Sequence, residues 1–122
     1  MQDGARQVGF IGVSDLDAAE LFYGGVLGLE LQDARPFALV HDDGASQLRI
    51  TLVDDVRAAP YTVLGWVVAD LEAELDRLVA AGVTFTRYDG MGQDDRGIWT
   101  SPSGARIAWF TDPDGNTLSL QA

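Results

Sequence analysis

The sequence predicts an α+β fold made of two tandem βαβββ modules, and an internal repeat is the main reason. The segment Gly12–Glu20 (GVSDLDAAE) returns 55 positions later as Val67–Leu75 (VVADLEAEL). In each copy a β-rich run precedes an aspartate suited to cap a helix, and an apolar stripe with a 3.6-residue period follows. Each copy alone would bury little apolar surface, so the 122 residues are expected to form a single domain, residues 1–122.

The first module, at about residues 6–54, begins with apolar residues that predict a strand at Val8–Val13. The aspartate that follows starts a predicted helix over Asp15–Leu27, which a glycine ends. Short apolar runs between turn residues predict the other three strands of this module, at Leu29–Gln32, Pro36–His41 and Gln47–Val53.

A linker at about residues 55–60 contains Ala58-Ala59-Pro60, which interrupts both kinds of pattern. The second module, at about residues 61–122, repeats the plan with a predicted strand at Thr62–Val68 and a helix that runs from Leu71 to Gly82. Apolar runs predict its later strands at Val83–Tyr88, Ile98–Ser101, Ala105–Thr111 and Thr117–Gln121.

The charge balance argues against two classes of partner. The chain has 19 acidic residues against eight basic ones, for a net charge of −11. Nucleic-acid backbones and anionic membranes are bound through clustered cations, so neither partner is expected. There is no cysteine, which excludes disulfides and thiolate chemistry. Acidic residues near the start and the lack of a long apolar run favour a cytoplasmic location.

Three runs together resemble the vicinal oxygen chelate superfamily, which includes glyoxalase I, bleomycin-resistance proteins and extradiol dioxygenases. They are FIGVSDLDAAELFYGGVLGLEL, ADLEAELDRLVAAGV and WFTDPDGNTLSL, and the likeness covers nearly the whole chain. The resemblance implies paired βαβββ modules whose curled mixed sheets enclose a cleft. Many members complete their clefts by dimerising, so a homodimer is expected.

Enzymes of this superfamily bind a divalent metal through residues on the first and last strands of each module. The motif carries the first ligand over to Val8 and Val63, and neither side chain has a donor atom. The ligands on the last strands carry over to Ser119 and to Arg49 or Thr51. Since these residues offer no strong donor, we expect no metal and no other cofactor.

The resemblance without the metal ligands favours a protein that binds a small aromatic or amphipathic molecule in the cleft. Strand alternation directs Phe10 towards the cleft, and Tyr88 adds an aromatic ring in the second module. Arg49 points either into the cleft, where it would attract an anionic oxygen, or to solvent. Trp99 and Trp109 belong either to the cleft wall or to the core.

Two further features leave alternatives open. The glycine-rich segment Tyr88–Gly97 is either an ordinary connection or a mobile lid that uses Asp89, Met91 or Arg96. His41, the only histidine, is expected at a strand end on the surface. No catalytic residue can be assigned. The alternative to a binding protein is a lyase, isomerase or dioxygenase-like enzyme of the same superfamily.

Overall fold

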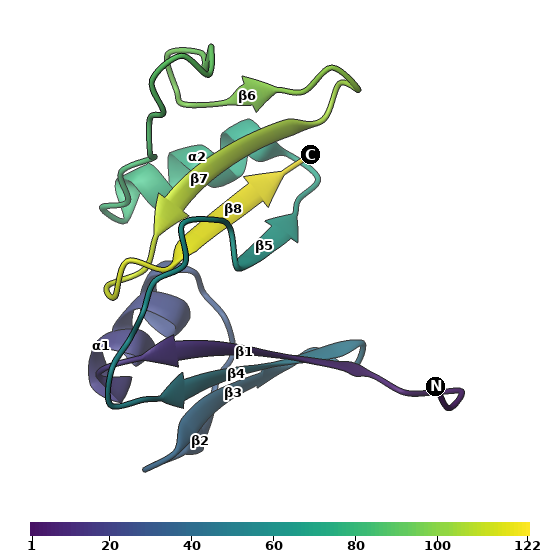
Figure 1. Cartoon of the computed structure of the whole chain (residues 1–122), viewed down its shortest axis with the longest axis vertical. Helices are drawn as coiled ribbons and strands as arrows, with labels where there is room; N and C mark the ends of the chain where they lie inside the picture. The colour runs from purple at the N-terminus through teal and green to yellow at the C-terminus, as the bar shows by residue number, and fades with distance from the viewer. The chain divides into compact units, whose positions relative to one another are not determined.

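A computed structural model describes all 122 residues, which form two compact units, Met1–Arg57 and Ala58–Ala122. Each unit contains one four-stranded mixed sheet and one helical segment in the order βαβββ (Figure 1). The α+β fold of two βαβββ modules is therefore confirmed. That the two modules fold as a single domain stays a prediction. No helix has the length and apolar character needed to cross a membrane.

The first unit has the strand order β1-β4-β3-β2, in which β1 runs parallel to β4 and the other pairs are antiparallel. Its elements in chain order are β1 (Gln7–Val13), α1 (Leu16–Ala19), η1 (Glu20–Val26), β2 (Gln32–Ala34), β3 (Ala38–Asp42) and β4 (Ser46–Leu52).

The second unit has the equivalent order β5-β8-β7-β6, again with its first strand parallel to its last. Its elements are β5 (Leu64–Val67), α2 (Leu71–Ala80), β6 (Trp99–Thr100), β7 (Arg106–Thr111) and β8 (Thr117–Gln121). Identical strand orders show that the sequence repeat is a repeat of structure.

Both helical segments begin at the predicted aspartates. The Asp15 carboxylate accepts hydrogen bonds from the backbone N–H groups of Asp17 and Ala18, at 2.8 and 3.2 Å. Asp70 accepts one from Ala73 N at 3.0 Å. These bonds satisfy N–H groups that have no partner within the helix.

Each sheet has a buried face and an opposite face, which we call the open face. On the first sheet Ile11 and Ile50 are buried cross-strand partners. On the second sheet Leu118 and Phe110 have the same relation. Arg106, which shares the buried face of β7, bonds Glu72 of α2, so α2 lies on this side of the second sheet. Function must then be sought on the faces that the helices do not cover.

The structure differs from the sequence prediction at three elements. The predicted helix of the first module is a short α-helix followed by a π-helix, η1. The strand expected at Leu29–Gln32 begins three residues later, at Gln32. The predicted strand Val83–Tyr88 is absent, although Thr86 N donates to Trp109 O at 2.7 Å. The Gln93 side chain bonds backbone groups in this segment, which replaces the pairing that a strand would need.

Candidate functional site

Two of the predicted site residues lie together on the open face of the first sheet. Phe10 and Arg49 are cross-strand partners in the parallel pair β1–β4, and Val40 of β3 is the partner of Arg49 on its other side. The Phe10 side chain is 69% exposed, whereas Arg49 is half-buried. Alternation along both strands places Ile11 and Ile50 on the buried face, as the sequence pattern predicts.

The register resolves which residue of β4 is equivalent to Ser119. In the second sheet Gly65 pairs with Ser119, and in the first sheet Phe10 pairs with Arg49. Because Gly65 follows Phe10 by the 55-residue repeat, Arg49 is the equivalent of Ser119, and Thr51 lies two positions further along. At this position the first sheet therefore has a pair of large residues, Phe10 and Arg49, and the second sheet has a pair of small ones, Gly65 and Ser119.

The other three predicted residues form an aromatic cluster in the second unit. The ring centroid of Trp109 lies 5.5 Å from that of Tyr88, edge to face, and 6.1 Å from that of Trp99, at a tilt of 37°. The indole N–H of Trp109 donates to the hydroxyl of Thr62 at 3.0 Å. Trp109 and its strand partner Ser119 lie on the open face, opposite the buried Phe110.

Trp99 lies on the same face, because its strand partner Ile107 alternates with the buried residues of β7. Trp99 and Trp109 are both half-buried, so their rings lie at the edge of solvent rather than in the core. Trp66 is also half-buried, but its cross-strand partner is Leu120, a residue of the buried face. Trp66 therefore lies on the other, buried face of the second sheet.

The loop Tyr88–Gly97 is held by hydrogen bonds of its own. The Gln93 carboxamide donates to Thr86 O at 2.9 Å and to Gly97 O at 2.8 Å, and it accepts from Tyr88 N at 2.6 Å. Arg96 bonds the Asp76 carboxylate of α2. These contacts are those of an ordered connection. Gln93 thereby fixes the backbone of Tyr88, a role that no motif in the sequence indicates.

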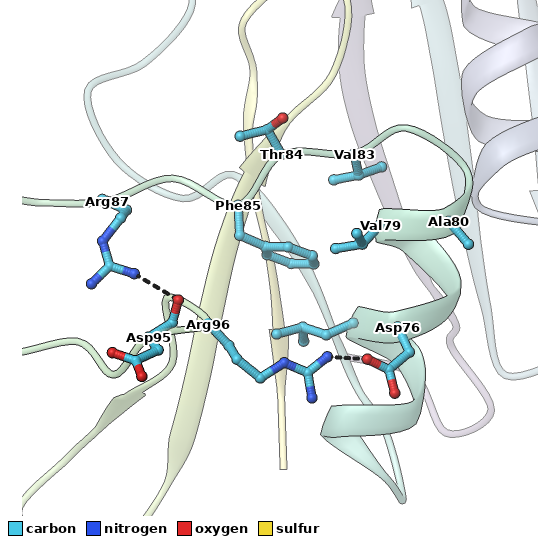
Figure 2. A pocket seen from close by; sticks show the side chains of 10 residues that line it. Asp76, Val79, Ala80, Val83, Thr84, Phe85, Arg87, Asp95 and Arg96 are labelled. Carbon is cyan, nitrogen blue, oxygen red and sulfur yellow. Dashed lines mark hydrogen bonds and ion pairs between the residues drawn. The ribbon is translucent and has the colours of Figure 1, made fainter.

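A shallow groove of about 660 Å³ lies between α2 and the segment that leads into this loop (Figure 2). Phe85 forms its apolar floor, with Val79 of α2 beside it. Arg96 crosses one end to reach Asp76, and Arg87 donates to the backbone carbonyl of Asp95 at 3.3 Å. Three of the four charged side chains that line the groove, those of Asp76, Arg87 and Arg96, are thus already bonded to the protein itself.

His41 and the DPDGN segment have structural roles. The Nδ1 atom of His41 lies 2.9 Å from Glu30 O, which ties β3 to the chain before β2. Asp112 is buried, and its carboxylate accepts from Asp114 N and Asn116 N, both at 2.9 Å. Its bonds close the turn between β7 and β8, so this motif shapes the fold rather than a reaction centre.

Comparison with known sequences and structures identifies the family. The sequence profile of the Glyoxalase/Bleomycin resistance protein/Dioxygenase superfamily matches residues 6–120. The chain belongs to this superfamily. The comparison with curated proteins gives no match.

Three similar crystal structures illustrate the shared fold. SMU.1112c is 24% identical, with a TM-score of 0.74, over 99% of this chain and 100% of its own. A superfamily member from Sphaerobacter thermophilus DSM 20745 is 26% identical, with a TM-score of 0.73, over 97% and 96% of the two chains. A glyoxalase/bleomycin resistance protein/dioxygenase from Alicyclobacillus acidocaldarius is 21% identical, with a TM-score of 0.72, over 97% and 90%.

The residues at the superfamily's metal-binding positions do not fit a divalent cation. The valine side chains at positions 8 and 63 have no donor atom, and Arg49 carries a positive charge. Ser119 supplies a single neutral hydroxyl, which occupies the space beside Gly65. No group of three or more His, Cys, Asp or Glu residues in the chain is arranged to hold a metal.

Proposed function

We propose that this superfamily member binds a small planar aromatic or amphipathic molecule without a metal ion, against the open face of its second sheet. The observation that carries the proposal is the cluster of Tyr88, Trp99 and Trp109, whose rings are neither in the core nor fully in solvent. A cytoplasmic location is part of the same proposal.

The geometry of the cluster suits a flat ligand. Aromatic rings attract one another in tilted and edge-to-face arrangements, and each pair contributes about 0.5–1.5 kcal/mol beyond the burial of its area. Trp109 stands at the centre of the cluster, and its indole N–H is already bonded to Thr62. The ring therefore stays oriented in the absence of a ligand, which lowers the entropy lost on binding.

The open-face residues of β8 that pair with β7 beside the cluster are polar and uncharged. On β8, Ser119 is the cross-strand partner of Trp109, and Gln121 is the partner of Ile107. Small-molecule sites combine apolar and aromatic walls with a small number of polar groups that orient the ligand. This composition supports binding of a small molecule, and the net charge of −11 argues against a nucleic acid in its place.

The test uses 2-naphthol, a planar probe that is neutral at pH 7, with decahydro-2-naphthol as the non-aromatic probe of similar size. Affinity is measured by calorimetry and by saturation-transfer NMR, with and without EDTA. The Tyr88→Leu change is compared with Tyr61→Leu, because Tyr61 is an exposed tyrosine outside the cluster, 68% exposed against 39%.

We expect 2-naphthol to bind more tightly than the saturated probe and to lose roughly 2- to 13-fold in affinity on Tyr88→Leu, the equivalent of one aromatic pair. Tyr61→Leu and EDTA should leave the affinity unchanged. Equal affinities for the two tyrosine variants, or no binding to the wild-type protein, would refute the aromatic site. Loss of binding in EDTA would refute metal independence.

A further inference from the structure

Seven of the eight arginines in this acidic chain are bonded to other groups of the protein. Six make ion pairs with carboxylates: Arg6, Arg35, Arg57, Arg77, Arg96 and Arg106. Arg87 donates to the backbone carbonyls of Asp95 and Gln93, at 3.3 and 3.4 Å. Arg49 is the exception, because its side chain makes no hydrogen bond or ion pair in the structure.

The environment of Arg49 makes this exception informative. The residue is half-buried on its strand, and its guanidinium has no hydrogen-bond or ion-pair partner in the protein. Its cross-strand partners are Phe10 on one side and the buried Val40 on the other, each one strand away, at about 4.8 Å. Neither of them offers an acceptor.

The polar groups on the same face leave the guanidinium free. Gln47 and Thr51 flank Arg49 along β4, and both are neutral. The carboxylate nearest in register is Asp42, the partner of Gln47. Asp42 is held by Arg6 at 2.7 Å and by Gly44 N at 2.9 Å, so its charge is already compensated.

We propose that Arg49 and Phe10 form a binding site for a small aromatic carboxylate on the open face of the first sheet. A guanidinium binds a carboxylate through two parallel hydrogen bonds, and its planar fork suits that geometry better than an ammonium group does. The exposed Phe10 ring in the neighbouring strand offers apolar surface to the ring of the ligand. The site stands on residues of the first unit alone and does not depend on the aromatic cluster of the second.

The test titrates the whole protein with benzoate, benzyl alcohol and acetate, by calorimetry and ligand-observed NMR. The variant is Arg49→Met, and its control is Arg57→Met, which removes the same charge from an exposed ion pair of the same unit. Phe10→Leu examines the ring contact. Circular dichroism of each variant establishes that it is folded.

We expect Arg49→Met to weaken benzoate binding by roughly 10- to 150-fold, the range for a hydrogen bond to a charged group. Arg57→Met should bind benzoate as the wild-type protein does, and benzyl alcohol should not respond to the loss of Arg49. Phe10→Leu should weaken benzoate more than acetate. Equal benzoate affinity in the two methionine variants, or no binding of benzoate to the wild-type protein at millimolar concentration, would overturn the proposal.

A second measurement is made on the wild-type protein, and the variant serves only to assign one signal. In the wild-type protein the Nε–Hε signal of Arg49, identified by its absence from the Arg49→Met spectrum, should shift on addition of benzoate, while the signals of the seven bonded arginines stay in place. A shift at Arg57 of the same size as that at Arg49 would reduce the interaction to general attraction of an anion by surface cations, and would contradict the site.

Discussion

Adding one methyl group at Gly65 should destabilise the second module, because the space above this residue is occupied. A Cβ at Gly65 would stand 2.2 Å from the Ser119 hydroxyl oxygen and 3.1 Å from the Ser119 carbonyl oxygen. Overpacking of this kind costs about 1–3 kcal/mol. Alanine is favoured over glycine within a strand by roughly 0.5–1 kcal/mol, so the net loss expected for Gly65→Ala is about 0.5–2 kcal/mol.

The assay is urea unfolding followed by far-UV circular dichroism, which reports on both modules, and by tryptophan fluorescence, which reports on the second module because all three tryptophans lie there. Gly9→Ala is the matched control in β1, since a Cβ there meets nothing nearer than 4.0 Å. Adding Ser119→Ala to Gly65→Ala should restore most of the lost stability, because it removes the closest atom. The reasoning fails if Gly65→Ala is as stable as Gly9→Ala, or if the double variant is no more stable than Gly65→Ala.

Four further outcomes are expected. Elemental analysis of the purified protein should find no stoichiometric divalent metal, and a chelator should leave the melting temperature unchanged; about one zinc, iron, nickel or manganese per chain would contradict this. Sedimentation at micromolar concentration should give a homodimer, and a monomer would count against the expectation from the superfamily. Gln93→Glu should cost roughly 1–3 kcal/mol in urea unfolding, because a carboxylate has no proton to donate to Thr86 O and Gly97 O; unchanged stability would show that these bonds contribute little. The Arg6 guanidinium holds the pKa of Asp42 below its ordinary 3.8, so the ion pair stabilises the folded protein fully above that pH and progressively less as the pH falls below it. The difference in the free energy of unfolding between wild type and Arg6→Met should therefore become smaller from pH 7 to pH 3. A difference that grows over this range would refute the assignment.

The fold could be predicted from the sequence wherever local chemistry and burial agree. Asp15 and Asp70 occupy the same position in the sequence repeat, and each caps the helix that follows it. Each also closely follows the apolar run that predicts a strand, so three independent observations mark the same boundary. Strand alternation gave the faces of β1 correctly because one face of the sheet is buried, as Ile11 and Val13 are.

The prediction was wrong where a side chain from a few residues further along the chain takes the hydrogen bonds of backbone groups that a strand would pair. Residues 83–88 have the composition of a strand, but the carboxamide of Gln93 takes the hydrogen bonds of Thr86 O and Tyr88 N. No periodicity contains that information. The change from α-helix to π-helix after Ala19 likewise leaves no trace in the apolar stripe.

For the candidate site, alternation was enough to name residues but not to group them. It could not decide whether Trp99 and Trp109 face the core, because alternation sorts the residues of a strand into two faces without showing which face is buried. The structure decides this through pairing: Trp109 is the partner of Ser119, and Phe110 is the partner of Leu118. The unpaired state of Arg49 is invisible in sequence, since it depends on where every carboxylate of the chain lies in space.

The two copies of the module separate the demands of stability from those of recognition. Leu48 and Ile50 in the first sheet correspond to Leu118 and Leu120 in the second, so the buried faces have kept the same character. At the position between them, which faces the other way, one copy has Arg49 where the other has Ser119. Each copy therefore serves as a reference for the other: positions where the copies agree report what the sheet needs in order to fold, and positions where they diverge report where selection was free to shape a surface.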